Sequence, residues 1–499
     1  MTEYEAVIGL ETHVQLNTKS KMFSYSSAEY QSAEPNTIAD PVSLALPGTL
    51  PVVNRKAVES AIKIGLALGC KIASVTKFDR KQYNYPDLLK GYQISQYDEP
   101  ICFDGRIELP GDNPHTVRIN RVHMEEDVAK LVHVDGLGGN SGYVLMDVNR
   151  AGVPLMEIVT EPDLRGAEDV VAYIESLQSI IRYLGVGTAN MEEGSFRCDA
   201  NISVRPKGSE KLGTKVEVKN MNRISAVARA VTYEIDRQIK AIENGERIVQ
   251  ETRGWNDGTG KTVVQRSKEE ANDYRYFPEP DIPPLEVSRE WVEEIESELP
   301  ELPAQRRSRI MTEFGLSEYD ARLITAVRTT AEYFEETIAV GPSGNRESRL
   351  QFAKETANWL NGEIARLMNN SSIVDVSATK VRPLSLAHLI ERVMKRELNS
   401  NTAKQVFEEM WKSGAEPEVI IEERGLGMVS DSGALEPAVN RAIAENAAAV
   451  RDYLGGKETA VRFLMGQVMK ATKSQADPPL VLKMLGEKLE AMKSGAGNE

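Results

Sequence analysis

The sequence has few cysteines, no long apolar run and no surplus of positive charge, and each absence excludes a class of protein. The three cysteines, Cys70, Cys102 and Cys198, lie far apart and form no C-x-x-C pair, which excludes a four-thiolate zinc site and argues against a disulfide framework. No apolar stretch reaches the roughly 18 residues of a membrane helix, and the start of the chain lacks a signal-peptide pattern. We therefore expect a cytoplasmic protein that does not enter a membrane.

The chain is acidic, with 60 basic and 75 acidic side chains and a net charge of −15. This balance argues against a protein that coats nucleic acid by charge alone. An anion bound here needs a divalent metal or individually placed lysines. The 499 residues are also too many for one hydrophobic core, so we expect two or three domains.

The usual nucleotide-binding and hydrolytic motifs are absent as well. The segment Gly258-Thr-Gly-Lys-Thr262 resembles the end of a P-loop, but Trp255 stands where its first glycine is required. The glycines that begin at Gly136 miss the dinucleotide spacing because Ser141 replaces the third one. Neither H-E-x-x-H nor G-x-S-x-G occurs. If ATP is used, metal and side chains on a sheet must hold its phosphates.

Strand and helix patterns mix as far as about residue 288, and nearly every later segment is helical in pattern. The segment Tyr274 to Pro284 marks the change, because four prolines in its last seven residues exclude a helix and predict a rigid extended exit. The pattern predicts an α+β domain over residues 1–290, an all-α domain over 291–400 and an all-α tail over 401–499, with the second joint near residues 397–401.

Three helices are predicted within the first domain, and we expect them to cover one side of a sheet. The first begins after Asn54 and runs to Leu68, the second spans Ala167 to Leu184, and the third spans Ile224 to Glu243. Helical patterns in the remainder of the chain cover residues 304–314, 318–340, 350–369, 384–398, 402–412, 435–447 and 458–472.

The strand predicted from Tyr4 to Leu16 has an apolar and a polar face. Its alternation places Glu11 and His13 side by side on the polar face, with Gly9 and Gln15. A carboxylate next to an imidazole can bind a divalent cation. The alternative, a solvated strand face, is the commoner meaning of an isolated Glu-x-His and stays open.

A second pair of strands has the same character. Residues 195–205 alternate strictly and place Asp199 on the polar face, and residues 214–220 place Glu217 and Lys219 opposite an apolar side. The two runs predict an antiparallel pair whose polar faces merge. An ordinary hairpin with cross-strand ion pairs remains an equal alternative.

Two further segments, 121–130 and 147–163, embed carboxylates in apolar strand-like sequence. Glu157 lies between the apolar residues Leu155-Met156 and Ile158-Val159. An unpaired charge at this position would cost several kcal/mol if it were buried. Such a carboxylate needs a cation. Oxygen ligands with one imidazole suit magnesium or manganese better than structural zinc, so one sheet face is predicted to present carboxylates, a histidine and lysines to magnesium and phosphate.

These segments resemble the B subunits of the bacterial glutamyl/aspartyl-tRNA amidotransferases, over essentially the whole chain. The motifs that carry the resemblance are Val7-Ile-Gly-Leu-Glu-Thr-His-Val14, Phe78-Asp-Arg-Lys-Gln-Tyr-Asn-Tyr-Pro-Asp87, Gly91-Tyr-Gln-Ile-Ser-Gln96, His123-Met-Glu-Glu-Asp127, Arg197-Cys-Asp-Ala-Asn-Ile-Ser203, Asp273-Tyr-Arg-Tyr-Phe-Pro-Glu-Pro280 and Gly466-Gln-Val-Met-Lys-Ala-Thr-Lys473.

The resemblance implies an antiparallel-sheet cradle that is the catalytic domain, a helical domain and a YqeY-like helical tail. It implies a carbon–nitrogen ligase with glutamine as amide donor. In that family the B subunit uses ATP and Mg²⁺ to phosphorylate the side-chain carboxylate of Glu-tRNA(Gln) or Asp-tRNA(Asn). Ammonia, made from glutamine by an A subunit and channelled to the site, then displaces the phosphate. A small C subunit completes a heterotrimer.

The resemblance also implies roles for individual residues. The implied metal ligands are His13, Glu126 and Glu157, the implied catalytic residues are Glu11, Asp199, Glu217 and Lys219, and Lys81 is implied on the ammonia route. Weaker tRNA contacts are expected at Arg462, Lys470 and Lys473. Some family members bind zinc through four cysteines, whose positions here hold Ser24, Ser26, Asp40 and Ser43, so no structural zinc is expected.

Two other functions compete with this one. The chain could be a non-catalytic scaffold subunit that presents tRNA and keeps a vestigial metal site, or a free-standing magnesium-dependent phosphotransferase or hydrolase. The intact carboxylate and histidine set argues against the scaffold, and the lack of a recognisable glutaminase nucleophile argues that glutamine is used only with a partner. The sequence does not determine whether Glu-tRNA, Asp-tRNA or both are substrates.

Overall fold

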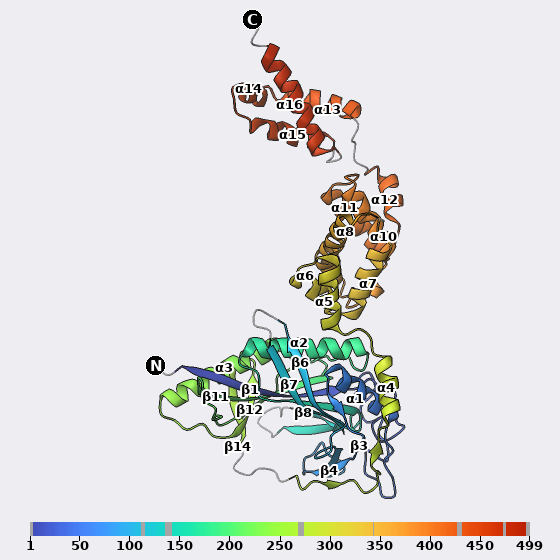
Figure 1. Cartoon of the computed structure of the whole chain (residues 1–499), viewed down its shortest axis with the longest axis vertical. Helices are drawn as coiled ribbons and strands as arrows, with labels where there is room; N and C mark the ends of the chain where they lie inside the picture. Colours follow the sequence, from blue (N-terminus) through green and yellow to red (C-terminus); the bar gives the residue numbers. More distant parts are fainter. Residues whose placement is uncertain are drawn as a thin grey trace. The chain divides into compact units, whose positions relative to one another are not determined.

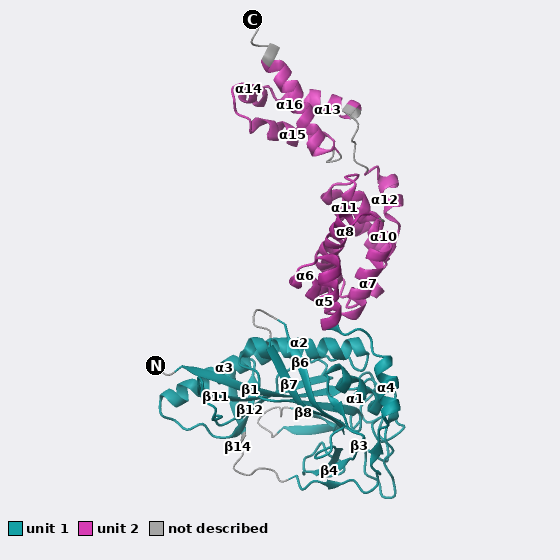
Figure 2. Cartoon of the chain, viewed as in Figure 1, with its two compact units in different colours: residues 1–303 teal, residues 304–499 magenta. Residues whose placement is uncertain are grey.

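The computed structural model describes residues 3–110, 115–134, 142–267, 274–342, 344–426, 432–472 and 476–495. The chain divides into two compact units, Met1–Pro303 and Ala304–Glu499 (Figures 1 and 2). Unit 1 is mixed α and β, and the described part of unit 2 is helical. The α+β fold followed by helices is therefore confirmed.

A nine-stranded sheet forms the centre of unit 1, in the order β14-β13-β12-β11-β1-β10-β7-β6-β2. All neighbouring pairs are antiparallel except β12 with β13. Its strands are β1 (Tyr4–Gln15), β2 (Lys71–Ile72), β6 (Cys102–Leu109), β7 (His115–Glu126), β10 (Pro154–Thr160), β11 (Phe196–Pro206), β12 (Val216–Lys219), β13 (Glu251–Asn256) and β14 (Lys261–Ser267).

Three smaller sheets complete unit 1. One has the order β15-β4-β5, and the other two are the pairs β16-β3 and β8-β9. Their strands are β3 (Val75–Thr76), β4 (Asp79–Gln82), β5 (Tyr92–Ser95), β8 (Lys130–Val134), β9 (Tyr143–Asp147), β15 (Phe277–Pro278) and β16 (Leu285–Glu286).

The helices α1 (Arg55–Ala67), α2 (Ala167–Leu184) and α3 (Ile224–Glu243) lie on one face of the large sheet (Figure 1). This confirms the prediction, and each boundary has a local cause. The Asn54 side chain accepts hydrogen bonds from two amides of the first turn of α1, and Gly185 ends α2 in the left-handed conformation. Apolar residues of the helices and of alternate strand positions form one core, so the other sheet face is left for polar side chains.

The proline-rich segment is extended as predicted, but it is not an exit from the domain. Its strand β15 pairs with β4, and the Glu279 side chain accepts two hydrogen bonds of 2.7 Å from Arg80. The next helix, α4 (Arg289–Ser297), buries Ile295 in the core of unit 1. The first unit therefore extends to Pro303 rather than to residue 290.

Unit 2 contains two separate apolar cores. The first includes buried residues from Ile310 to Ile420 and the second from Leu435 to Leu489. The predicted joint at residue 400 falls at the start of α11 (Ser400–Ser413), whose buried residues, such as Phe407, pack in the first core. The first core of unit 2 therefore continues past residues 397–401, where the joint was predicted, and includes α11.

The predicted helical segments of unit 2 are largely present, although two of them are interrupted and three helices had not been predicted. The residues predicted as one helix over 318–340 form α6 and α7, and a π-helical turn interrupts the segment 350–369. The additional helices are α12, α14 and α16. The elements are α5 (Pro303–Phe314), α6 (Glu318–Thr325), α7 (Arg328–Ala339), α8 (Arg346–Trp359), η2 (Leu360–Ile364), α9 (Ala365–Asn370), η3 (Val376–Ala378), α10 (Pro383–Met394), α11 (Ser400–Ser413), α12 (Pro417–Arg424), α13 (Ser432–Glu445), α14 (Ala447–Leu454), α15 (Ala460–Ala471) and α16 (Pro478–Gly495). Among the described residues, no helix is long and apolar enough to cross a bilayer.

Candidate active site

A row of three side chains crosses the polar face of the large sheet. His13 on β1 lies opposite Glu157 on β10, which lies opposite His123 on β7. The three share a face because directly paired residues of antiparallel strands point to the same side. Glu157 Oε2 lies 3.4 Å from His13 Nε2 and 3.5 Å from His123 Nε2.

The Glu157 carboxylate is only 4% exposed, and basic groups surround it. Arg121 Nη2 lies 3.4 Å from its Oε1. Burial alone would raise the pKa of Glu157, but His123 and His13 hold it well below the usual value. The positive charge that this buried carboxylate was expected to need is therefore supplied in part by histidine and arginine side chains of the protein.

Arg121 also determines which ring nitrogen of His123 carries the proton. Its Nε donates a hydrogen bond of 3.3 Å to His123 Nδ1, so the imidazole proton lies on Nε2 and faces Glu157. His123 then orients Glu157 rather than offering a free lone pair. His13 is consequently the better metal ligand of the two histidines.

Two more carboxylates approach the row. Glu11 Oε1 and Glu125 Oε1 each lie 3.7 Å from His13 Nε2. Burial lowers the pKa of His13, but Glu157, Glu125 and Glu11 outweigh it and raise the value to about 9. Burial and the nearby Glu157 also raise the pKa of Glu11. Negative charge is thus concentrated around one imidazole, which favours binding of a cation.

The donor atoms here fit a magnesium or manganese ion. In the set Glu11, His13 and Glu157, one ligand atom from each residue lies within 4.8 Å of the others. A second set, His123, Glu125 and Glu157, meets the same criterion and shares Glu157. Carboxylate oxygens with a single imidazole are ligands that these hard cations accept. The Nε2 proton that His123 directs at Glu157 makes this second set the poorer candidate.

One lysine, paired with two carboxylates, lies beside the row on the next two strands. Lys219 Nζ on β12 lies 2.7 Å from Asp199 Oδ2 and 3.2 Å from Glu217 Oε1. Burial lowers the pKa of Lys219, but Asp199 and Glu217 raise it above its usual value. Since Asp199 pairs directly with Glu11 across β11 and β1, the lysine and the candidate metal ligands face one continuous surface. The predicted antiparallel pairing of these strands is confirmed.

Lys81 approaches the same surface from the small sheet. It lies on β4, and its Nζ is 5.2 Å from the centre of the Tyr274 ring. Burial lowers the pKa of Lys81, but Glu125 and Glu157 raise it above the ordinary value. The structure therefore places the lysine predicted on the ammonia route next to the carboxylate row.

Glu126 is the one predicted metal ligand that the structure does not bring to this row. Glu126 carries an ion pair with Lys90, and its Oε1 accepts a hydrogen bond of 3.1 Å from the Ile94 amide. Successive strand residues point to opposite faces, so Glu126 lies on the face opposite to His123 and Glu125. The geometry thus places Glu125, rather than the predicted Glu126, beside His13, and the ligand role of Glu126 stays a prediction.

Sequence reasoning also missed His123 and Arg121. The signal was present, because period-two alternation from Arg121 puts Arg121, His123 and Glu125 on one face. Both Glu125 and Glu126 are buried. A prediction that assigns polar residues to the exposed face therefore does not detect this alternation. The register of β7 with β10 is what shows which of the two carboxylates meets Glu157.

Comparison with known proteins assigns the chain to a family. Residues 6–293 match the GatB/GatE catalytic domain and residues 332–489 match the GatB domain. The B subunit of the aspartyl/glutamyl-tRNA(Asn/Gln) amidotransferase of Dehalococcoides mccartyi (strain ATCC BAA-2266 / KCTC 15142 / 195) is 52% identical over 493 residues, which cover 98% of this chain and 100% of the relative. The B subunits of the same name from Herpetosiphon aurantiacus and Moorella thermoacetica are 49% and 51% identical, with 98% of this chain and 99% and 100% of the relatives covered.

The chain belongs to the family of amidotransferase B subunits. The resemblance inferred from the motifs is therefore confirmed. Both units take part in the family match, since the second matched region lies within unit 2.

The segment that holds Ser24, Ser26, Asp40 and Ser43, where the resemblance implied zinc cysteines in some relatives, contains a buried ion pair. Lys21, which is 0% exposed, places its Nζ 3.2 Å from Asp40 Oδ2 and 2.8 Å from the Ile38 carbonyl oxygen. The other Asp40 oxygen accepts hydrogen bonds of 3.0 Å from the amides of Val42 and Ser43. An ammonium and one carboxylate with serines do not fit the thiolate and imidazole donors of a structural zinc site.

Two of the three predicted tRNA contacts lie on α15 of unit 2. Arg462 and Lys470 are exposed, and Gly466 lies midway between them along the helix. The neighbouring Phe463 is 52% exposed. Lys473 lies outside the described residues. The two described side chains thus share one solvated helix edge, as predicted.

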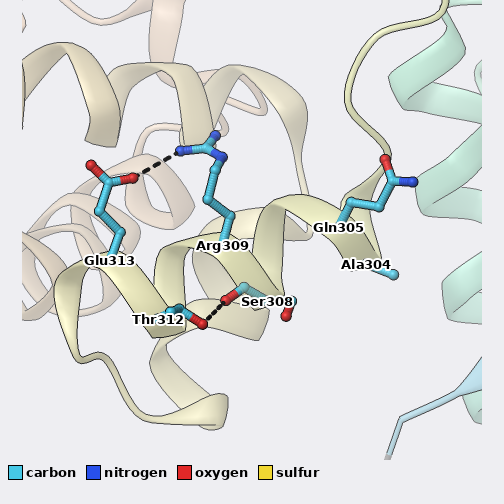
Figure 3. A pocket seen from close by; sticks show the side chains of 6 residues that line it. All are labelled: Ala304, Gln305, Ser308, Arg309, Thr312 and Glu313. Carbon is cyan, nitrogen blue, oxygen red and sulfur yellow. Dashed lines mark hydrogen bonds and ion pairs between the residues drawn. The ribbon is translucent and has the colours of Figure 1, made fainter.

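A hollow of about 640 Å³ runs along one helix of unit 2 (Figure 3). Its lining comes from α5 alone, where Arg309 forms an ion pair of 3.5 Å with Glu313, one turn further along. Side chains of a single helix face do not converge on a ligand. We therefore assign this hollow no part in the chemistry.

Proposed function

We propose that this chain uses ATP and Mg²⁺ to phosphorylate the side-chain carboxylate of Glu-tRNA(Gln), Asp-tRNA(Asn) or both, and then amidates it with ammonia. The chain would thus be the acceptor-activating subunit of a carbon–nitrogen ligase that takes its nitrogen from glutamine. The observation that carries the proposal is the group formed by Glu11, His13 and Glu157 on one sheet face, with Lys219 beside it. The substrate class follows from the names of the relatives.

The first chemical problem is to bring a carboxylate to a triphosphate, because both are anions. Mg²⁺ held by Glu11, His13 and Glu157 would supply Lewis acidity that neutralises phosphate charge. Lys219 adds a fixed positive charge on the same face. One substrate carboxylate oxygen attacks the γ-phosphorus, ADP leaves, and an acyl phosphate results. Asp199 and Glu217 hold the lysine in place through its ion pairs.

The second step replaces phosphate with nitrogen. Ammonia attacks the acyl carbon, and inorganic phosphate leaves with one of the original carboxylate oxygens. Only neutral NH₃ is a nucleophile, and the positive charge of Lys81 beside Glu125 disfavours entry of ammonium. Lys81 would therefore act by selecting the neutral species on its way to the site.

The proposal includes partners. The sequence has no recognisable glutaminase nucleophile, so an A subunit would hydrolyse glutamine and a C subunit would hold the two together in a heterotrimer. Arg462 and Lys470 would contact tRNA phosphates from their exposed helix edge. The cytoplasmic location stays a prediction from the sequence.

The test is reconstitution with A and C subunits, followed by conversion of Glu-tRNA(Gln) to Gln-tRNA(Gln) with ATP, Mg²⁺ and glutamine. We expect the double variant His13→Ala/Glu157→Ala to lose ATP-dependent conversion. His133→Ala, an exposed histidine on β8, is the matched control and should keep it. Retained conversion in the double variant would refute the metal assignment and favour the scaffold alternative.

A further inference from the structure

A second hollow opens next to the carboxylate row. It has a volume of about 540 Å³, which is within the range of small-molecule sites. Tyr97, Asp98, Glu99, Phe103 and Arg121 contribute to its lining. None of the residues predicted from the sequence lies there, and the proposed chemistry leaves the hollow without an occupant.

Arg121 joins the hollow to the reaction site. Arg121 lines the hollow, and its guanidinium lies 3.4 Å from Glu157 and donates a hydrogen bond to His123. A ligand in the hollow that contacts Arg121 is therefore adjacent to the candidate metal ligands. Because Glu157 belongs to the candidate set with Glu11 and His13, this end of the hollow is where phosphate or acyl groups would meet the metal.

Tyr97 provides an ordered aromatic surface at another part of the hollow. Its ring stacks on Tyr276 with centres 4.1 Å apart and planes 7° from parallel. The side chain is nevertheless 57% exposed. A ring that is fixed by one stacking partner and open elsewhere is suited to receive a flat heteroaromatic group.

The two residues that follow Tyr97 are acidic. Asp98 is held by Lys77, with Nζ 2.6 Å from Oδ1, and Glu99 is exposed. Carboxylates accept hydrogen bonds from ribose hydroxyls and repel phosphates. The lining thus combines an aromatic ring, carboxylates that can accept hydrogen bonds from hydroxyls, and an arginine beside the candidate metal ligands. These are the groups that the base, the ribose and the phosphate or ester of an adenosine derivative would contact.

We propose that this hollow binds an adenosine group, with the base on Tyr97, the ribose near Glu99 and the reactive end directed by Arg121 toward Glu157. The inference rests on the proposed function, in which two substrates carry adenosine: ATP, and the 3′-terminal nucleotide of the aminoacyl-tRNA. Both have the chemistry that the lining would recognise, and kinetics can distinguish them.

The experiment compares Tyr97→Ala, Tyr97→Phe and Glu99→Gln in the assembled complex with A and C subunits. The matched control is Tyr25→Ala, since Tyr25 is 97% exposed and lies outside the hollow. The KM for ATP is measured at saturating Glu-tRNA(Gln), and the KM for Glu-tRNA(Gln) at saturating ATP. Thermal melting of each variant checks the fold. Binding of ATP without tRNA is measured by calorimetry, which needs no turnover.

We expect Tyr97→Ala to raise one of the two KM values roughly tenfold, the usual contribution of stacking one base on one aromatic ring. Tyr97→Phe should restore it, and Glu99→Gln should raise the same KM about threefold through a weaker hydrogen bond. A change in the KM for ATP assigns the adenosine to ATP, and a change in the other assigns it to the tRNA end.

Unchanged KM values and unchanged ATP affinity in folded Tyr97→Ala and Glu99→Gln overturn the inference, as does a loss confined to kcat. Failure of the proposed function is a separate result, in which the wild-type complex forms no Gln-tRNA(Gln). In that case equilibrium binding of ATP and of Glu-tRNA(Gln), each measured separately, still decides: an affinity for either that depends on Tyr97 supports the adenosine site, and affinities for both that equal those of the control overturn it.

Discussion

Glu125 and Glu126 are consecutive in the chain but lie on opposite faces of β7, so exchanging each for glutamine should have opposite consequences. Glu125 lies 3.7 Å from His13 in the carboxylate row. Glu126 is 4% exposed and pairs with Lys90, whose side chain is 7% exposed. The first substitution alters the charge of the candidate metal site, and the second breaks a buried ion pair.

The size of each effect follows from these surroundings. Glu126→Gln leaves a buried ammonium without its counter-charge, which costs about 3–5 kcal/mol and should lower the melting temperature by roughly 5–15 °C. Glu125→Gln removes one charge that attracts His13 and Lys81 but leaves Glu157 to balance both, so we expect a smaller loss of stability without metal than for Glu126→Gln. Loss of a metal-site carboxylate should instead raise the Mg²⁺ concentration for half-maximal amidation by roughly 10- to 100-fold.

The assay is a Mg²⁺ titration of amidation by the reconstituted complex, with thermal melting in chelator. Glu246→Gln, an exposed glutamate after α3, serves as the control for the substitution itself. The reasoning from strand faces is refuted if Glu126→Gln shifts the Mg²⁺ dependence while Glu125→Gln does not. It is also refuted if Glu125→Gln acts only by lowering the melting temperature.

Three further predictions concern other parts of the chain. Lys21→Met leaves Asp40 buried without its ammonium partner and should reduce the free energy of unfolding of unit 1 by about 3 kcal/mol. The double variant Lys21→Met/Asp40→Asn should lose less. Denaturant titration measures both. Burial raises the pKa of Glu335, but hydrogen bonds from two arginines bring it below the usual value. Its contribution to stability is therefore present above the unfolded pKa near 4.5 and lost as the pH falls through the folded pKa, so Glu335→Gln should lower the melting temperature at pH 7 and have little effect near pH 3. Arg462→Ala and Lys470→Ala should each weaken tRNA binding and reduce the slope of log K against log salt by about 0.7–0.9 in filter-binding measurements.

Local signals account for the parts of the fold that were predicted correctly. Asn54 and Gly185 mark helix ends through their own hydrogen bonds and backbone conformation, and the alternation around His13 needs only neighbouring residues. The polar face of β1 and the pairing of β11 with β12 could be predicted for the same reason. Such features depend on short-range chemistry, which the sequence displays directly.

The parts that could not be predicted depend on long-range contacts. The proline segment was interpreted as an exit because its pairing partner β4 lies about two hundred positions earlier in the chain. Arg121 and His123 acquire their role only when the register of β7 with β10 places them against Glu157. The Tyr97 hollow likewise combines residues from separate strands and loops, and no periodicity indicates it.

The central claim is that a substrate carboxylate attacks ATP on this sheet face, and one isotope measurement tests it directly. Glu-tRNA(Gln) whose side-chain carboxylate carries ¹⁸O is amidated by the reconstituted complex, and the released inorganic phosphate is analysed by mass spectrometry. An acyl phosphate intermediate requires one ¹⁸O atom in phosphate for each amide formed. Amidation that proceeds with ATP hydrolysis but leaves the phosphate unlabelled would contradict the account.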